Sequence, residues 1–124
     1  MRVRTNIPSK LYVNENDIII CARNGSKHLV GKSALIKEIS EPMTFGAFMA
    51  ICKTSIYDWV YLFLQSNIFY SQLSLTSSTT TINQLTQKSF NEFLIPIPAK
   101  NEMQNIISNI KALISLINQL IYLQ

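Results

Sequence analysis

The stretch of the chain with the clearest chemical character runs from Arg23 to Lys37, which holds four cations and no acidic residue. Two of these cations, Arg23 and Lys27, lie beside Asn24 and Ser26, whose short side chains donate and accept hydrogen bonds. Cationic side chains attract phosphates, and neutral polar side chains position phosphates or contact base edges. These residue types therefore predict a surface for a phosphate-bearing partner.

The candidate contact residues form two groups in the sequence. The first group follows an apolar run and consists of Arg23, Asn24, Ser26, Lys27, His28 and Lys32. The second group belongs to the uncharged Ser/Thr-rich segment Ser74–Gln84 and the residues just after it, and consists of Thr79, Thr80, Gln84 and Lys88. Taken one by one, each is equally well interpreted as an ordinary solvated loop residue. The first group as a whole favours a binding role.

A hairpin is expected to position the first group. Residues 18–22 form an apolar run of strand length that is rich in β-branched side chains. Asn24-Gly25 is a dipeptide typical of two-residue hairpin turns, and the return half, Leu29–Ile36, is again apolar. Gly31 within that half indicates a bulge or a close approach by another part of the chain. The pattern predicts a ribbon with a basic tip.

The rest of the first hundred residues predicts an α+β fold, with a small and mostly antiparallel sheet and a packed helix. Met43–Lys53 is expected to be a strand that bends at Gly46, with its Met and Phe side chains in the core. An amphipathic helix follows and runs to about Asn67. Thr86–Phe90 predicts one helical turn, and Phe93–Ile97 predicts a short edge strand, since prolines lie in and after it.

The end of the chain, from about Asn101, predicts one long amphipathic helix. Its apolar residues recur at heptad spacing and include Ile106, Ile110, Leu113, Ile114, Ile117, Leu120 and Ile121. We expect this stripe to form a subunit interface, although packing within its own domain is the alternative. Because charged pairs flanking the stripe are scarce, a larger bundle or an antiparallel pair is favoured over a two-stranded zipper. The predicted domains are residues 1–98 and 99–124.

The composition excludes several classes of protein. An apolar fraction of 48% and a net charge of +4 are typical of a folded, mildly basic domain. Cys21 and Cys52 are expected to be buried thiols, and one histidine without a CxxC motif predicts no metal site. Glu15 and Asp17 are expected to be solvated turn residues, so no catalytic residue and no cofactor is predicted. Without a membrane span or a signal peptide, a cytoplasmic location is expected.

Four segments of the chain, taken together and in their order along the sequence, resemble the specificity subunit of type I restriction–modification systems. They are the 17–36 stretch, SNIFYSQL, the threonine-rich loop with TQKSFNEFLIPIP, and EMQNII. In that family a target recognition domain ends in a strand with a proline pair, and a long helix follows that opens with a Glu-Gln-x-x-Ile/Val type of pattern. The counterparts in this chain are Pro96, Pro98, Glu102, Gln104, Ile106 and Ile107. At the helix start, Met103 and Asn105 depart from the polar and basic residues usual there.

The resemblance implies a module that reads double-stranded DNA and is not an enzyme. Methyl transfer would belong to separate modification subunits. Cleavage would belong to a restriction subunit, which would join the assembly through the modification subunits. A family recognition domain normally has further strands before the hairpin, so this chain is expected to be a fragment or a half-subunit with an incomplete sheet. Pairing with itself or with another specificity half is expected through the helix. The alternative is an assembly module that dimerises without reading DNA.

Overall fold

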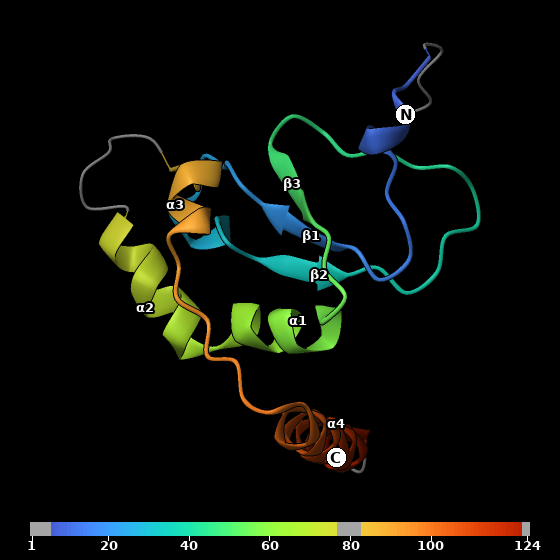
Figure 1. The fold of residues 1–124 in the computed structure, drawn as a ribbon, viewed down its shortest axis with the longest axis vertical. Helices are drawn as coiled ribbons and strands as arrows, with labels where there is room; N and C mark the ends of the chain where they lie inside the picture. Colours follow the sequence, from blue (N-terminus) through green and yellow to red (C-terminus); the bar gives the residue numbers. More distant parts are fainter. Residues whose placement is uncertain (1–5, 77–82, 123–124) are drawn as a thin grey trace. The chain divides into compact units, whose positions relative to one another are not determined.

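A computed structural model describes residues 6–76 and 83–122, and it divides the chain into two compact units, Met1–Phe93 and Leu94–Gln124. The first unit contains a three-stranded antiparallel sheet in the order β2-β1-β3 (Figure 1). The strands are β1 (Ile18–Cys21), β2 (Ser33–Leu35) and β3 (Met49–Cys52). Two short 3₁₀ helices, η1 (Ser9–Leu11) and η2 (Lys27–Leu29), lie in the connections. The predicted α+β class is confirmed.

The middle strand β1 anchors the sheet to the core. Ile18 lies opposite Leu35 of β2 and Cys52 of β3, and both Ile18 and Ile20 are buried. Helix α1 (Tyr57–Gln65) packs against β2, and the Gln65 side-chain amide donates a hydrogen bond of 2.9 Å to the Ser33 hydroxyl. The alternation of buried and partly exposed residues along β1 is that of a strand with one face on the core.

A cluster of aromatic rings holds the helices of the first unit together. Phe69 of α2 (Asn67–Thr76) is fully buried and packs edge-to-face on Phe63 and Phe93, with ring centroids 5.7 and 5.5 Å away. Each such pair contributes about 0.5–1.5 kcal/mol beyond the area that it buries. The cluster therefore fixes α2 against α1 and against the segment after α3 (Gln87–Asn91).

Three predicted elements differ from the structure in their extent. The helix expected to reach about Asn67 ends at Gln65, because Ser66 is extended and its hydroxyl donates to the Phe63 carbonyl. The strand expected over 43–53 is limited to β3, since a turn closes with a hydrogen bond from the Met49 amide to the Gly46 carbonyl. Residues 93–97 form no strand, and Pro96 lacks the amide that a ladder needs.

The prediction of a two-residue hairpin turn at Asn24-Gly25 is wrong. Among the described residues only Asn16 and Gly31 have positive φ, whereas the tightest hairpin turn needs it at both central positions. The Asn24 side chain instead accepts a hydrogen bond of 2.8 Å from the Ser26 amide, and the connection runs on through η2. β1 and β2 are thus joined by a broad loop with a basic face.

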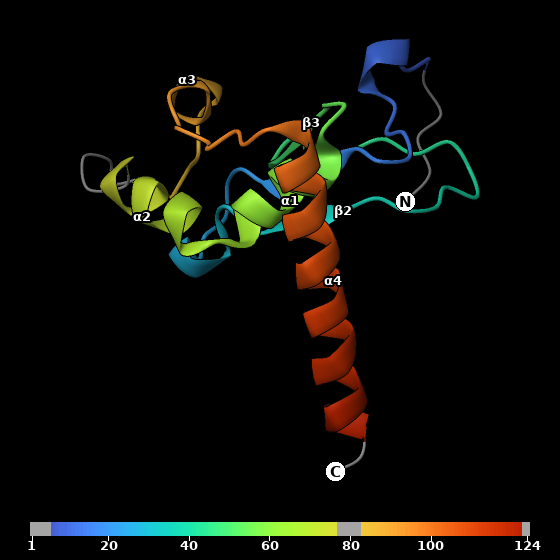
Figure 2. The same ribbon diagram turned by 60° about the horizontal axis from the view of Figure 1, so that its bottom comes forward.

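The second unit consists of an irregular segment followed by one long helix, α4 (Lys100–Tyr122), as the heptad pattern predicts. Figure 2 shows α4 as a continuous helix. At 1.5 Å per residue, it is about 35 Å long.

Asp17 is not the solvated turn residue that the sequence suggests. It closes the turn before β1 by accepting from the Asn14 amide at 2.8 Å, and it forms an ion pair with Lys53 just after β3. Asp17 is 6% exposed. A buried carboxylate is costly without a partner, and Lys53 provides that partner. The ion pair therefore links the beginning of β1 to the end of β3.

Gly31 is the glycine whose replacement should cost the most. Its φ is +89°, and a Cβ atom there would lie 2.5 Å from Leu73 Cδ2 and 3.2 Å from Phe69 Cε1. Gly31→Ala should therefore lower the free energy of unfolding by about 1–3 kcal/mol in urea denaturation. Gly46→Ala is the control, because no atom lies within 4 Å of its added Cβ. Equal stability of the two variants would contradict this account of Gly31.

The thiol of Cys52 reports on the charge of Asp17. Burial, and then the nearby Asp17 carboxylate, raise the pKa of Cys52 above its ordinary value of 9.0. The pH dependence of alkylation at Cys52 should show this raised pKa, and Asp17→Asn should lower it. A raised thiol pKa disfavours the thiolate in the folded state, so stability should fall as pH rises above 9. An alkylation profile unchanged by Asp17→Asn would refute the charge coupling.

Candidate nucleic-acid interface

Two segments about 60 residues apart in the sequence meet at the exit of β1. Arg23 forms an isolated antiparallel bridge with Gln84. On either side of this bridge, the Leu85 amide donates to the Ala22 carbonyl at 2.7 Å and the Asn24 amide donates to the Asn83 carbonyl at 3.3 Å. The two groups of candidate residues, separate in the sequence, are therefore joined through their backbones.

Side-chain hydrogen bonds stiffen the same junction. The Asn83 amide nitrogen Nδ2 donates to the Gly25 carbonyl at 3.1 Å, and the Asn24 carbonyl oxygen Oδ1 accepts from the Ser26 amide. Asn24 is half-buried, whereas Ser26 is exposed. Asn24 thus shapes the loop, and Ser26 is the side chain that remains available to a partner.

The cations of this region are exposed and have no acidic partner among the described residues. Arg23, Lys27, Lys32 and Lys88 are all exposed, and the ion pair between Asp17 and Lys53 involves none of them. His28, also exposed, follows Lys27 in η2. Exposed arginine and lysine side chains without an acidic neighbour attract an anionic partner.

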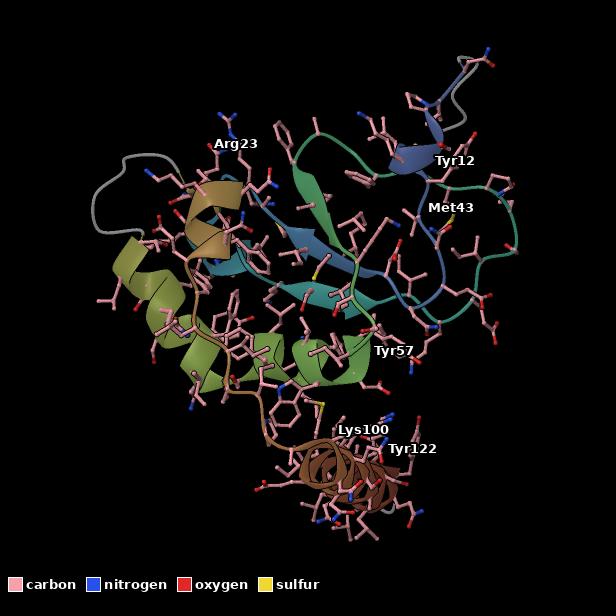
Figure 3. All side chains as sticks on the ribbon, viewed as in Figure 1. Tyr12, Arg23, Met43, Tyr57, Lys100 and Tyr122 are labelled. Atoms are coloured by element: carbon pink, nitrogen blue, oxygen red, sulfur yellow. The ribbon has the colours of Figure 1, made fainter. Side chains whose placement is uncertain are left out.

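The topology brings these cations to one end of the sheet. The loop 22–32 leaves β1 and enters β2, and Lys88 lies on α3, which begins after the Leu85–Ala22 hydrogen bond. The Thr86 hydroxyl caps α3 by accepting from the Ser89 amide at 3.1 Å. Figure 3 shows Arg23 extending from this end, while Tyr12 and Met43 lie at the other. We call this end of the sheet, with residues 22–32 and 83–88, the basic end.

Two predicted residues cannot be placed. Thr79 and Thr80 lie outside the described residues, and Gln84, which is described, is exposed on the bridge with Arg23. The structure therefore brings together Arg23, Asn24, Ser26 and Gln84, with Lys27, His28, Lys32 and Lys88 on the adjoining loop and helix. Whether any of them contacts a ligand stays a prediction.

Phe48 also belongs to this region, although the sequence pattern predicts a core position for it. Phe48 is 59% exposed, and the guanidinium of Arg23 lies 5.6 Å from its ring centroid. Its carbonyl accepts hydrogen bonds from the amides of Ala22 and Arg23. The Met and Phe pattern of residues 43–53 does not indicate the contact between Phe48 and Arg23, because this contact depends on the register between β1 and β3.

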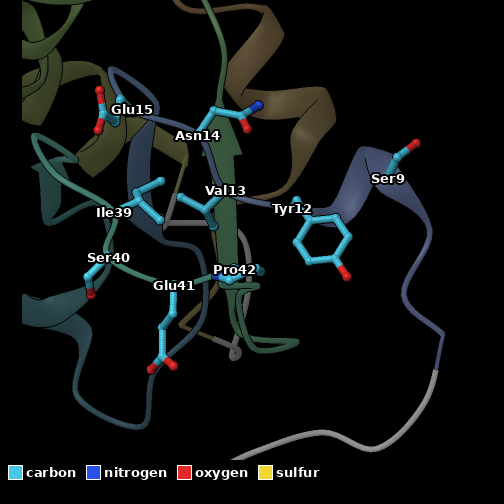
Figure 4. Close-up of a pocket in the computed structure, with 9 residues that line it drawn as sticks. All are labelled: Ser9, Tyr12, Val13, Asn14, Glu15, Ile39, Ser40, Glu41 and Pro42. Atoms are coloured by element: carbon cyan, nitrogen blue, oxygen red, sulfur yellow. The ribbon is translucent and has the colours of Figure 1, made fainter.

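The opposite end of the sheet has a different electrostatic character. A broad hollow of about 680 Å³ lies there, and its charged lining residues are the carboxylates Glu15 and Glu41. Figure 4 shows both carboxylates with the Tyr12 ring and Val13. Carboxylates do not attract phosphates, unlike the cationic side chains of the basic end. The described residues contain no group of His, Cys, Asp and Glu that could hold a metal ion.

The predicted interface residues all lie on α4. Leu113, Ile114, Ile117, Leu120 and Ile121 are each at least 50% exposed, and Ile106 and Ile110 are partly exposed. A lone helix cannot bury its own apolar stripe, and a subunit interface on this stripe stays a prediction. No described helix is both long and apolar enough to cross a membrane.

The chain thus combines a small α+β unit that has a basic end with a long helix that carries an exposed apolar stripe. The family model described as type I restriction modification DNA specificity domain matches residues 6–122. The chain therefore belongs to this family, and the resemblance seen in the sequence is confirmed.

Two curated relatives support this assignment. The type I restriction enzyme StySPI specificity subunit of Salmonella potsdam is 28% identical over 106 residues, and the EcoKI specificity subunit of Escherichia coli strain K12 is 29% identical over the same length. Each match covers 83% of this chain but only 23% of the relative. The chain thus spans about a quarter of their length. No solved structure matches significantly.

Proposed function

We propose that the chain reads double-stranded DNA as part of a type I restriction–modification specificity subunit. The observation that carries the proposal is the basic end, where Arg23 of the Arg23–Gln84 bridge and the nearby Lys27, Lys32 and Lys88 are exposed and have no acidic partner within residues 6–76 and 83–122. Phosphate contacts from Arg23 and the lysines would supply affinity, and Asn24, Ser26 and Gln84 would be the candidates for base-edge contact or phosphate positioning. A good bidentate base contact discriminates by about 1–3 kcal/mol.

This role needs no catalytic group of the chain's own. The family is one of DNA specificity domains, and methyl transfer and cleavage would fall to separate modification and restriction subunits. The partners that we propose are duplex DNA, the modification subunits and, through them, the restriction subunit. A cytoplasmic location fits this assembly.

The exposed stripe of α4 supports a second part of the proposal, pairing with another copy or with another specificity half. Leu113, Ile117 and Leu120 leave apolar surface that a second helix would cover. Burying apolar surface contributes about 25 cal/mol per Å² to association, and the entropy cost of association opposes this gain. The alternative function, assembly without DNA reading, depends on the same stripe and predicts dimers that do not bind DNA.

The salt dependence of DNA binding tests the basic end. Arg23→Ala combined with Lys27→Ala should weaken binding to a labelled random-sequence duplex and reduce the slope of log K against log salt by up to about 1.8, because two phosphate contacts are lost. Fluorescence anisotropy across a salt series measures both quantities.

The control is Lys10→Ala combined with Lys37→Ala, which lowers the net charge equally at exposed positions away from the basic end. It should leave the slope near that of the wild type. If both double variants behave alike, binding reflects net charge and not this surface. If the wild-type chain forms dimers but does not bind DNA, the assembly alternative is correct.

Aspartate substitutions in the apolar stripe of α4 test whether this stripe forms an interface. Ile110→Asp combined with Ile117→Asp should abolish self-association, or docking to modification subunits, because carboxylates would be buried in an apolar interface. Light scattering after size exclusion measures the mass. Ser108→Asp combined with Ser115→Asp adds the same charge at the same spacing on the polar face, and should have little effect. Survival of both oligomer and complex in the isoleucine variant would rule out this interface.

A further inference from the structure

The turn before β3 places an aromatic ring at the basic end. The turn closes with a hydrogen bond of 3.0 Å from the Met49 amide to the Gly46 carbonyl, and Phe48 lies within it. The Phe48 carbonyl accepts from the Ala22 amide at 2.9 Å and from the Arg23 amide at 3.1 Å. The backbone of Phe48 is therefore fixed to the same residues that begin the cationic loop.

The ring of Phe48 is too exposed to serve mainly as core. Phe48 as a residue is 59% exposed, whereas the buried phenylalanines of this unit, Phe63 and Phe69, are 8% and 0% exposed. Its contact with Arg23 is a cation–π geometry, with the guanidinium carbon 5.6 Å from the ring centroid. Such a contact attracts the cation and restricts a side chain that would otherwise sample many rotamers.

We propose that Phe48 is the positioning residue for Arg23 in DNA recognition, so that the two side chains act as one unit. The inference rests on the proposed function and deepens it. A guanidinium held on an aromatic face keeps its planar set of donors ready for a phosphate or for a guanine edge. The bridge to Gln84 fixes the Arg23 backbone, and Phe48 restricts the side chain.

A double-mutant cycle on the full chain tests this coupling, with a labelled random-sequence duplex as the probe. Phe48→Leu should weaken binding about two- to five-fold, the affinity equivalent of an exposed cation–π contact. The slope of log K against log salt should stay at the wild-type value, because no charge is removed. Phe48→Tyr keeps the aromatic face and should bind within about two-fold of the wild type.

The decisive comparison is made in the Arg23→Ala background. If Phe48 acts through Arg23, Phe48→Leu should cause no further loss once Arg23 is absent. Met43→Ala removes another exposed apolar side chain, at the opposite end of the sheet, and should leave binding unchanged. Thermal unfolding verifies that each variant is folded, and Phe48→Met replaces Phe48→Leu if the latter is not.

The outcomes separate this inference from the proposed function. If the wild-type chain binds DNA but Phe48→Leu binds equally well, or if its effect adds fully to that of Arg23→Ala, the positioning role is refuted and DNA reading stands. If the wild-type chain binds no DNA, the proposed function fails first, and the inference fails with it.

Discussion

The antiparallel bridge between Arg23 and Gln84 holds the two segments of the basic end together. Its flanking hydrogen bonds, from Leu85 to Ala22 and from Asn24 to Asn83, join a loop early in the chain to a segment 60 residues later. Closing so long a loop costs conformational entropy, which the buried Phe69 cluster and the sheet must offset. As a result of this bridge, cations from distant parts of the sequence lie on one surface.

The two ends of the sheet use charge in opposite ways. At one end, the buried carboxylate of Asp17 is neutralised by Lys53 and serves the fold. At the basic end, the cations have no acidic partner among the described residues, so their charge is not used for stability. This division makes physical sense, since an exposed ion pair adds little to folding but would compete with a phosphate for the same cation.

The long helix and the chemistry of the loop could be predicted from the sequence, because both depend on local signals. The heptad spacing around Ile110 and Ile117 predicts α4, and the run of cations after Cys21 predicts the basic loop. The turn at Asn24-Gly25 could not be predicted correctly, since pairing with Asn83 overrides the local preference of that dipeptide. Phe48 was missed for the same reason, because a tertiary register and not the sequence pattern places it beside Arg23.

The most direct test of the central claim is a map of backbone amide chemical-shift changes on adding duplex DNA to the isotope-labelled chain. We expect the changes to cluster in the basic end, at residues 22–32 and 83–88, and at Phe48. The turn at Asn14–Asp17 and the carboxylate-lined hollow should remain unperturbed. Changes concentrated around Glu15 and Glu41, or confined to α4, would contradict it.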